Sequence, residues 1–282
     1  MKAADFAYRR PADLAGALAI LSAEEGDIAP LAGGQSLMPM MNFRIAQPTM
    51  LLDLADVAEL RGVTAGPDGL RIGAMTRYVQ LAADPLVTQG APLIGLALPH
   101  IAHAAIRNRG TIGGSVALAD PAAEMPALLL AMAARIELVS LSGRRVVAAD
   151  DFFLGLYETA RAPDELVAAI HIPADASRRR VGFYELARRH GDYAMAGVAL
   201  TAGGATGQPL ASPRIAFFGL SDRAVRATGA EAALKDAQPA GDTLGAAVDS
   251  LSALPINGDL HAPPDVKLKL AGVVLRRALA GM

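Results

Sequence analysis

Apolar residues recur at helical spacing in several stretches of this chain. In residues 11–25, Leu14, Leu18 and Leu21 fall on one face; the stretch opens with a proline, which suits a first helical turn, and is followed by a glycine. A further helix is predicted to begin at Asp120, a good N-cap residue, with proline after it. The same spacing predicts helices over residues 92–103, 231–235, 243–250 and 266–279.

Shorter apolar runs, bounded by turn residues, predict strands between these helices. Near the N-terminus they cover residues 28–32 and 50–54, and further on they form two hairpins, 62–74 and 135–148, around glycine-containing turns. After residue 173 the pattern changes. Three antiparallel strands are predicted at residues 181–189, 193–202 and 214–220, followed by helices. The chain therefore reads as mixed α and β structure with a domain boundary near residues 173–178.

Composition narrows the class of protein. The 282 residues are 52% hydrophobic, enough for two or three folded domains. The richest apolar run, residues 125–134, is about half the ~20 residues that a membrane helix needs. The N-terminal segment carries charges where a secretory signal would be apolar. We therefore expect a cytoplasmic protein with no transmembrane segment.

Charge and cysteine content exclude several functions. A net charge of −2, short arginine groups and 4% aromatic residues argue against nucleic-acid binding. The chain has no cysteine, so it can form no disulfide, thiolate nucleophile or cysteine-ligated metal centre. Any redox chemistry must use a bound organic cofactor.

Two glycine-paired loops are the main candidates for a binding site. They are Ala32-Gly33-Gly34-Gln35-Ser36 and Thr111-Ile112-Gly113-Gly114-Ser115. Glycine lets a ligand approach the backbone closely, and each loop sets backbone N–H groups beside a hydroxyl, as phosphate sites do. Neither matches the Gly-x-Gly-x-x-Gly or P-loop motif. Taken singly, each is more simply an ordinary turn.

Other polar residues point less clearly to chemistry. His100 and His103 could share a helix face, but a metal site needs another ligand, so packing or local hydrogen bonding explains them better. Glu124 is read as a helix-start residue. Tyr193 is either a core aromatic or a ring placed against a planar ligand. No catalytic residue and no metal ligand are assigned.

Three segments together resemble a known family. They are Ala-Gly-Gly-Gln-Ser-Leu-Met-Pro-Met-Met-Asn-Phe-Arg at 32–44, Ile-Arg-Asn-Arg-Gly-Thr-Ile-Gly-Gly-Ser at 106–115 and Ala-Asp-Pro-Ala-Ala-Glu at 119–124. The chain resembles, over essentially its whole length, the FAD-binding medium subunit of the molybdenum hydroxylases, the family of xanthine dehydrogenase and aerobic carbon monoxide dehydrogenase.

The resemblance implies an α+β fold of the vanillyl-alcohol-oxidase (PCMH) type. Two α+β FAD-binding subdomains, residues 1–57 and 58–176, would hold the cofactor. A C-terminal α+β domain, residues 177–282, with a three-stranded antiparallel sheet and helices, would close on it.

The resemblance also implies a cofactor site. The segments Ala32 to Ser36 and Thr111 to Ser115 would surround the FAD pyrophosphate, with Gln35 assigned by location because relatives vary there. Ile101 would pack against the flavin, Glu124 would lie near the cofactor, and Tyr193 would lie by the isoalloxazine ring. Relatives commonly have asparagine at position 115, so the shorter Ser115 is expected to lose that contact or to make it through water.

By the same resemblance, the chain is an electron-transfer subunit. A large partner would hold the molybdenum cofactor and a small partner the iron–sulfur clusters, in a dimer of heterotrimers, and the FAD subunit would pass electrons to an external acceptor. Two alternatives stay open: a self-contained FAD-dependent reductase resembling UDP-N-acetylenolpyruvoylglucosamine reductase, and a scaffold or regulatory module without flavin.

Overall fold

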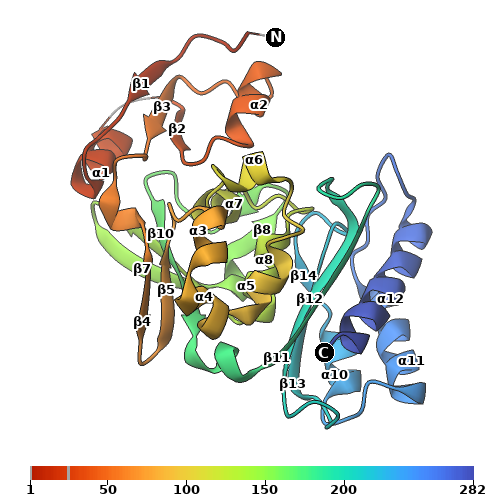
Figure 1. Cartoon of the computed structure of the whole chain (residues 1–282). Helices are drawn as coiled ribbons and strands as arrows, with labels where there is room; N and C mark the ends of the chain where they lie inside the picture. The colour runs from red at the N-terminus through yellow and green to blue at the C-terminus, as the bar shows by residue number, and fades with distance from the viewer. Residues whose placement is uncertain (1, 24–25) are drawn as a thin grey trace.

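Three larger sheets follow one another along the chain (Figure 1). The computed structural model describes residues 2–23 and 26–282. The N-terminal unit contains a parallel sheet of order β1-β3-β2. Its elements are β1 (Ala7–Arg9), α1 (Leu14–Ala23), β2 (Ile28–Leu31), α2 (Leu37–Asn42), β3 (Met50–Asp53) and a 3₁₀ turn (Ala58–Leu60).

Helix α1 forms where the apolar spacing predicts it. Leu14, Leu18 and Leu21 are buried against Leu52 of β3, and the same core reaches Leu166 of the central sheet. The last two residues of the predicted helix, 24 and 25, lie outside the described residues. The N-terminal unit is thus fixed on the central one, which places the loop after β2 beside it.

The central unit is a five-stranded antiparallel sheet, order β4-β5-β10-β6-β7, with helices on one face. Its strands are β4 (Val63–Gly66), β5 (Gly69–Gly73), β6 (Arg135–Ser140), β7 (Gly143–Ala148) and β10 (Leu166–Pro173); a small sheet adds β8 (Phe153–Gly155) and β9 (Glu158–Thr159). Its helices are α3 (Tyr78–Ala83), α4 (Pro85–Gly90), α5 (Pro92–Ala97), α6 (Ala104–Arg107), α7 (Ile112–Leu118), α8 (Glu124–Ala131) and α9 (Ala149–Phe152), with a 3₁₀ helix (Ala174–Arg178) after β10. Both predicted hairpins are present.

The C-terminal unit is a four-stranded antiparallel sheet backed by three helices. It comprises β11 (Arg180–Ala187), β12 (Ala194–Gly203), β13 (Ala211–Phe218), β14 (Val225–Arg226), α10 (Thr228–Leu234), α11 (Gly241–Asp249), a 3₁₀ turn (Ser250–Ala253) and α12 (Pro264–Ala280). The three predicted strands are present, and β14 adds a fourth that was not predicted, because two residues are too short to produce an alternating pattern.

Strand alternation explains why this sheet lies between the central unit and helices α10–α12 (Figure 1). Phe217 belongs to the core formed with the three helices, whereas its neighbours Ala216 and Phe218 belong to the core of the central unit. Successive side chains of a strand point to opposite faces, so both faces of the sheet are apolar. The sheet is therefore buried on both sides.

One predicted helix is shorter than expected. Helix α5 ends at Ala97 rather than at His103. After it, the N–H groups of His100 and Ile101 donate to carbonyls only three residues earlier, and Ala102 then has a left-handed φ of 45°. The guanidinium of Arg107 donates hydrogen bonds to the carbonyls of Ile101 (2.9 Å) and Ala102 (2.8 Å). These bonds stabilise the segment as an irregular turn, and the spacing of apolar residues in the sequence gives no sign of them.

Another predicted helix starts later than expected. Helix α8 begins at Glu124 with Ala123 as its N-cap, so the expectation for Asp120 was wrong. The Asp120 carboxylate instead accepts from the N–H of Ala122 (2.9 Å), a turn that aspartate commonly forms with the second residue after it. Helix α7 precedes this turn and ends at Leu118; its C-cap residue, Ala119, has a left-handed φ of 54°.

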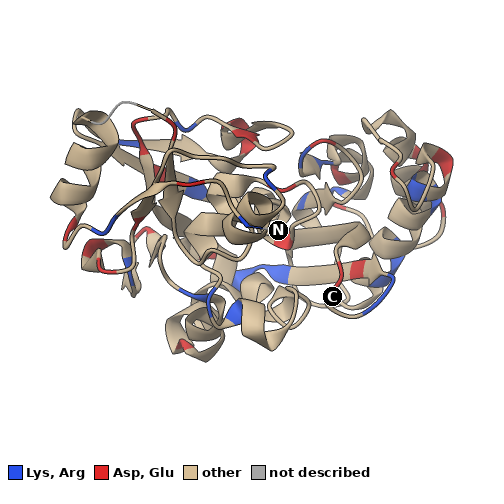
Figure 2. Ribbon diagram, turned by 90° about the horizontal axis from the view of Figure 1, so that it is seen from above, with Lys and Arg blue, Asp and Glu red and all other residues tan. Residues whose placement is uncertain are grey.

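Charged residues are distributed in small groups over the described chain (Figure 2). The arginines near the start of β11 have local roles: Arg179 donates to the hydroxyl of Thr201 (3.0 Å), and Arg180 donates to the carbonyl of Gln208 (3.1 Å). In the part of the chain that the structure describes, no helix combines the length and the apolar character needed to span a membrane.

Candidate functional site

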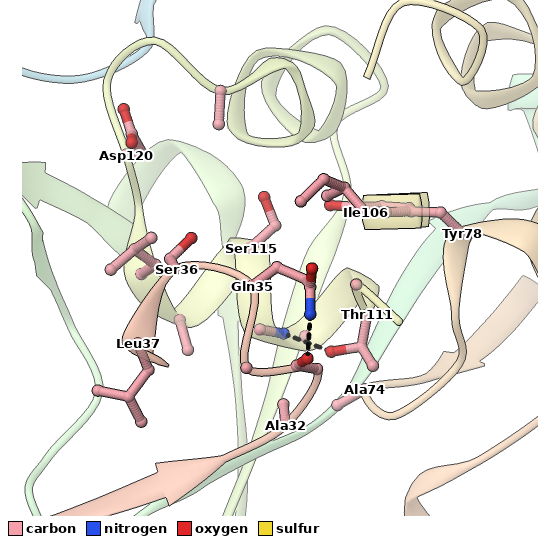
Figure 3. Close-up of a pocket in the computed structure, with 18 of the residues that line it drawn as sticks. Ala32, Gln35, Ser36, Leu37, Ala74, Tyr78, Ile106, Thr111, Ser115 and Asp120 are labelled. Atoms are coloured by element: carbon pink, nitrogen blue, oxygen red, sulfur yellow. Dashed lines mark hydrogen bonds between the residues drawn. The ribbon is translucent and has the colours of Figure 1, made fainter. Parts of the chain in front are cut away.

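A cavity of about 510 Å³ lies where the three units meet (Figure 3). Its wall includes the loop after β2, the segment between β5 and α3, the region from Ile101 to Glu124, the start of β10, and residues 191–193 before β12. Twelve of the thirteen predicted site residues line it: Ala32, Gly33, Gly34, Gln35, Ser36, Ile101, Thr111, Gly113, Gly114, Ser115, Glu124 and Tyr193.

Ile112 is the predicted residue that the cavity does not include. Its side chain is fully buried in the core of the central unit. Its N–H donates to the carbonyl of Thr76 (3.1 Å). Ile112 therefore anchors the second loop and does not offer a side chain or an N–H group to a ligand.

The first glycine loop presents unpaired backbone donors. Among the described residues, none accepts a hydrogen bond from the N–H groups of Gly33, Gly34, Gln35 or Ser36. Gly34 has a φ of 70°, a conformation that favours glycine, and the Gln35 amide donates to the carbonyl of Gly33 (2.9 Å), which braces the loop. Successive free N–H groups of this kind suit an anion.

The second glycine loop differs from the prediction of bare N–H groups. The N–H of Gly113 donates to the carbonyl of Ala74 (2.8 Å), that of Gly114 to the hydroxyl of Thr111 (3.1 Å), and that of Ser115 to the carbonyl of Thr111 (3.2 Å). The loop is the first turn of α7 with Thr111 as N-cap. Besides the backbone of its lining residues, the loop offers the cavity the Ser115 hydroxyl, toward which the phenol of Tyr78 points (Figure 3).

A glycine of each loop packs closely on a neighbouring segment, Gly33 on the residues just before the second loop and Gly113 on the segment after β5. A Cβ placed on Gly33 would lie 2.3 Å from the carbonyl oxygen of Arg109, and one on Gly113 would lie 2.4 Å from Cβ of Ala74. Real Cβ contacts are not this short. Both positions therefore require glycine for close packing of backbone on backbone, and this packing sets the shape of the cavity.

Burial controls the ionisation of Glu124 in the cavity wall. The residue is 9% exposed, and burial raises the pKa of its carboxyl to about 7, with a further contribution from the charge of Asp120. A carboxyl at this point of the wall is thus partly protonated near neutral pH.

Tyr193 stands at the mouth of the cavity. Its ring is 67% exposed although it lines the wall. Gly191, with a φ of 86°, packs on Ala102, where a Cβ would lie 3.1 Å from the carbonyl oxygen. The C-terminal unit thus brings an exposed aromatic residue to the irregular turn after α5. Of the two roles that the sequence left open for Tyr193, the exposure excludes that of a core aromatic.

Comparison with known proteins assigns the family. Residues 4–175 match the family described as FAD binding domain in molybdopterin dehydrogenase, and residues 182–282 match the CO dehydrogenase flavoprotein C-terminal domain. The chain belongs to the FAD-binding medium subunits of molybdenum hydroxylases.

Whole-length similarity supports the assignment of this medium subunit. The chain is 37% identical to the caffeine dehydrogenase subunit beta of Pseudomonas sp. (strain CBB1), covering 99% of this chain and 95% of the relative. It is 36% identical to the nicotine 6-hydroxylase medium subunit of Paenarthrobacter nicotinovorans, covering 99% and 98%. A solved carbon monoxide dehydrogenase from Hydrogenophaga pseudoflava superposes with a TM-score of 0.95 at 38% identity, covering 99% of this chain and 98% of that one. The predicted fold class is confirmed.

The cavity of the medium subunit includes residues that sequence reasoning missed. Tyr78 and Ile106 lie next to each other beside the second loop (Figure 3), and Arg161 belongs to the segment before β10. The guanidinium of Arg161 donates to the carbonyl of Glu165 (2.8 Å). Tyr78 and Arg161 stand outside the glycine-containing segments, so no local signal pointed to them, whereas Ile106 opens the segment 106–115 but was not assigned to the site.

His100 and His103 do not share a helix face in this medium subunit. His103 lines the cavity as the N-cap of α6, whereas His100 lies in the turn after α5, where its Nδ1 is 3.7 Å from Oε1 of Glu185. Within the described residues, no group of three or more histidine, aspartate or glutamate side chains is arranged to hold a metal ion.

The raised pKa of Glu124 predicts a pH effect on stability. Because the native protein holds this proton more tightly than the unfolded chain, the stabilisation is full below about pH 4.5 and is lost as the pH rises through about 7. We expect Glu124→Gln to flatten the fall in the free energy of unfolding between about pH 5 and pH 8, measured by urea denaturation. An unchanged fall would contradict the assignment.

Proposed function

We propose that this chain holds FAD in the cavity between its three units and passes electrons from iron–sulfur clusters of a partner subunit to an external acceptor. The observation that carries the proposal is the row of unpaired N–H groups from Gly33 to Ser36, on residues that line a cavity whose shape depends on glycine contacts. The family assignment supports the same cofactor.

The residues present suit the chemistry of FAD. The first loop would hold the pyrophosphate, because its N–H groups lack a partner and hydrogen bonds to a charged group contribute roughly 1.5–3 kcal/mol each. The Ser115 hydroxyl would add a donor from the second loop. Ile101 and Tyr193 would contact the isoalloxazine ring, since both line the cavity and offer apolar surface.

A bound flavin accepts and releases electrons, and the protein supplies binding, orientation and electrostatics. The apolar wall around Ile101 excludes water from one side of the site. The exposed Tyr193 leaves the mouth open to a second molecule. This arrangement suits a subunit that receives electrons from one protein and delivers them to another acceptor.

The chain would act within a larger assembly. We propose a large partner with the molybdenum cofactor and a small partner with the iron–sulfur clusters, in a dimer of heterotrimers. Within the chain, we propose that residues 1–57 and 58–176 form the two FAD-binding subdomains and that residues 177–282 close the site. The absence of cysteine supports placing the clusters on a partner.

Spectroscopy of the purified chain tests the proposal. We expect the flavin absorption bands, and release of FAD rather than FMN on denaturation, at about one FAD per chain. Mixed with its partner subunits and their substrate, the flavin band should bleach; the chain alone should turn over no organic substrate. Turnover by the chain alone would favour the self-contained reductase, and a protein that takes up no flavin would favour the scaffold.

A further inference from the structure

Glu185 on β11 is a buried carboxyl without a cationic partner. Its side chain is 5% exposed, and its Oε2 has no hydrogen-bond partner. The buried glutamates Glu137, Glu165 and Glu231 differ, because each accepts hydrogen bonds from an arginine. Burying a carboxylate without a cationic partner costs free energy, so burial favours the protonated, neutral form of such a group.

The groups around Glu185 connect it to the cavity on one side and to solvent on the other. Burial, with a smaller contribution from the charge of Glu124 in the cavity wall, raises the pKa of Glu185 to about 8. On the other side, Nδ1 of His100 lies 3.7 Å from its Oε1. The His100 side chain is 39% exposed, and its ring centroid is 6.2 Å from that of His190.

No arginine or lysine of the described residues forms an ion pair with Glu185, and Asp120 adds a second negative charge beside Glu124. Two neighbouring buried carboxyls titrate as a pair, and the first proton neutralises most of their repulsion. The tendency of the pair to bind a proton therefore depends on any further charge in the cavity.

We propose that Glu185 and Glu124 jointly take up one proton from solvent, through His100, when a bound flavin is reduced. The inference rests on the proposed function. Two electrons arrive from the reductant, an iron–sulfur cluster of the partner in the complex or dithionite in the test. A flavin that takes up these two electrons with only one proton of its own would keep one added negative charge, and one further proton from water would bind the carboxyl pair in compensation. Glu185 does not line the cavity, so it would act on the flavin only through its charge.

The midpoint potential of the FAD-loaded full chain tests the coupling. Measured from about pH 6 to pH 10, the wild-type potential should fall more steeply above the pKa of the pair, by one proton per two electrons, or about 30 mV per tenfold change in proton activity. Glu185→Gln should lack this extra slope while keeping its flavin. Glu158→Gln, which removes an exposed carboxylate, is the matched control and should follow the wild type.

A second measurement does not depend on flavin. The infrared band of protonated carboxyl groups in the apoprotein should titrate above neutral pH in the wild type and in Glu158→Gln, and should lose this component in Glu185→Gln. An unchanged titration in Glu185→Gln, or an unchanged slope of the potential in a variant that retains flavin, would overturn this inference but not the proposed function. A wild-type chain that binds no flavin would overturn the proposed function and this inference with it.

Discussion

Gly33→Ala is expected to weaken FAD binding roughly 10- to 100-fold. The added Cβ would lie 2.3 Å from the carbonyl oxygen of Arg109, so the first loop must move away from the backbone of residues 109–110. Overpacking of this kind costs about 1–3 kcal/mol, and here the cost falls on the geometry that directs the free N–H groups at the cavity. Isothermal titration of apoprotein with FAD measures the change in Kd.

Gly66→Ala provides the control for the same chemical change. Gly66 ends β4, and a Cβ there would meet no atom within 4 Å. This variant should bind FAD as the wild type does and unfold at a similar temperature. Equal Kd values for the Gly33 and Gly66 variants would refute the role of the first loop.

Phe218→Ala is expected to lower the free energy of unfolding by roughly 3–5 kcal/mol. The ring is fully buried, stacks on Phe183 with centroids 5.9 Å apart, and occupies the space over Gly197 that a Cβ would fill. Removing it leaves a cavity between the C-terminal sheet and the central unit. Because this interface carries Tyr193 to the mouth of the site, flavin affinity should fall as well.

Chemical denaturation measures the loss of stability, with Phe43→Ala as the matched variant. Phe43 is 64% exposed, and truncation of such a residue usually changes stability by less than about 0.5 kcal/mol. If the Phe218 variant were as stable as the Phe43 variant, the C-terminal unit would not be held by the packing described above.

Much of the fold followed from local patterns. The predicted strands and hairpins are present because alternation of apolar residues and glycine-containing turns act within a few residues of one another. The start of α8 was predicted wrongly at Asp120, because its carboxylate can cap a helix or close a turn, and both choices satisfy the same local chemistry.

The end of α5 shows a different reason for failure. The stretch that follows Ala97 has helical character in sequence, but the guanidinium of Arg107 binds the carbonyls of Ile101 and Ala102 and holds them out of a helix. Such bonds come from a side chain five or six residues further along the chain, and they leave no periodic pattern of apolar residues in the sequence. This turn nevertheless supplies part of the cavity wall.

By itself, the sequence determined the mixed α and β class, part of the order of the elements, the two glycine loops and the exclusion of cysteine chemistry, because these depend on residue type and short-range spacing. Only the tertiary structure decided that the first loop keeps its N–H groups free while Ala74 and Thr111 occupy those of the second. It alone buried the Oε2 atom of Glu185 without a hydrogen-bond partner. Hydrogen-bond acceptors and burial come from segments distant in sequence, and both are set when the three units pack together.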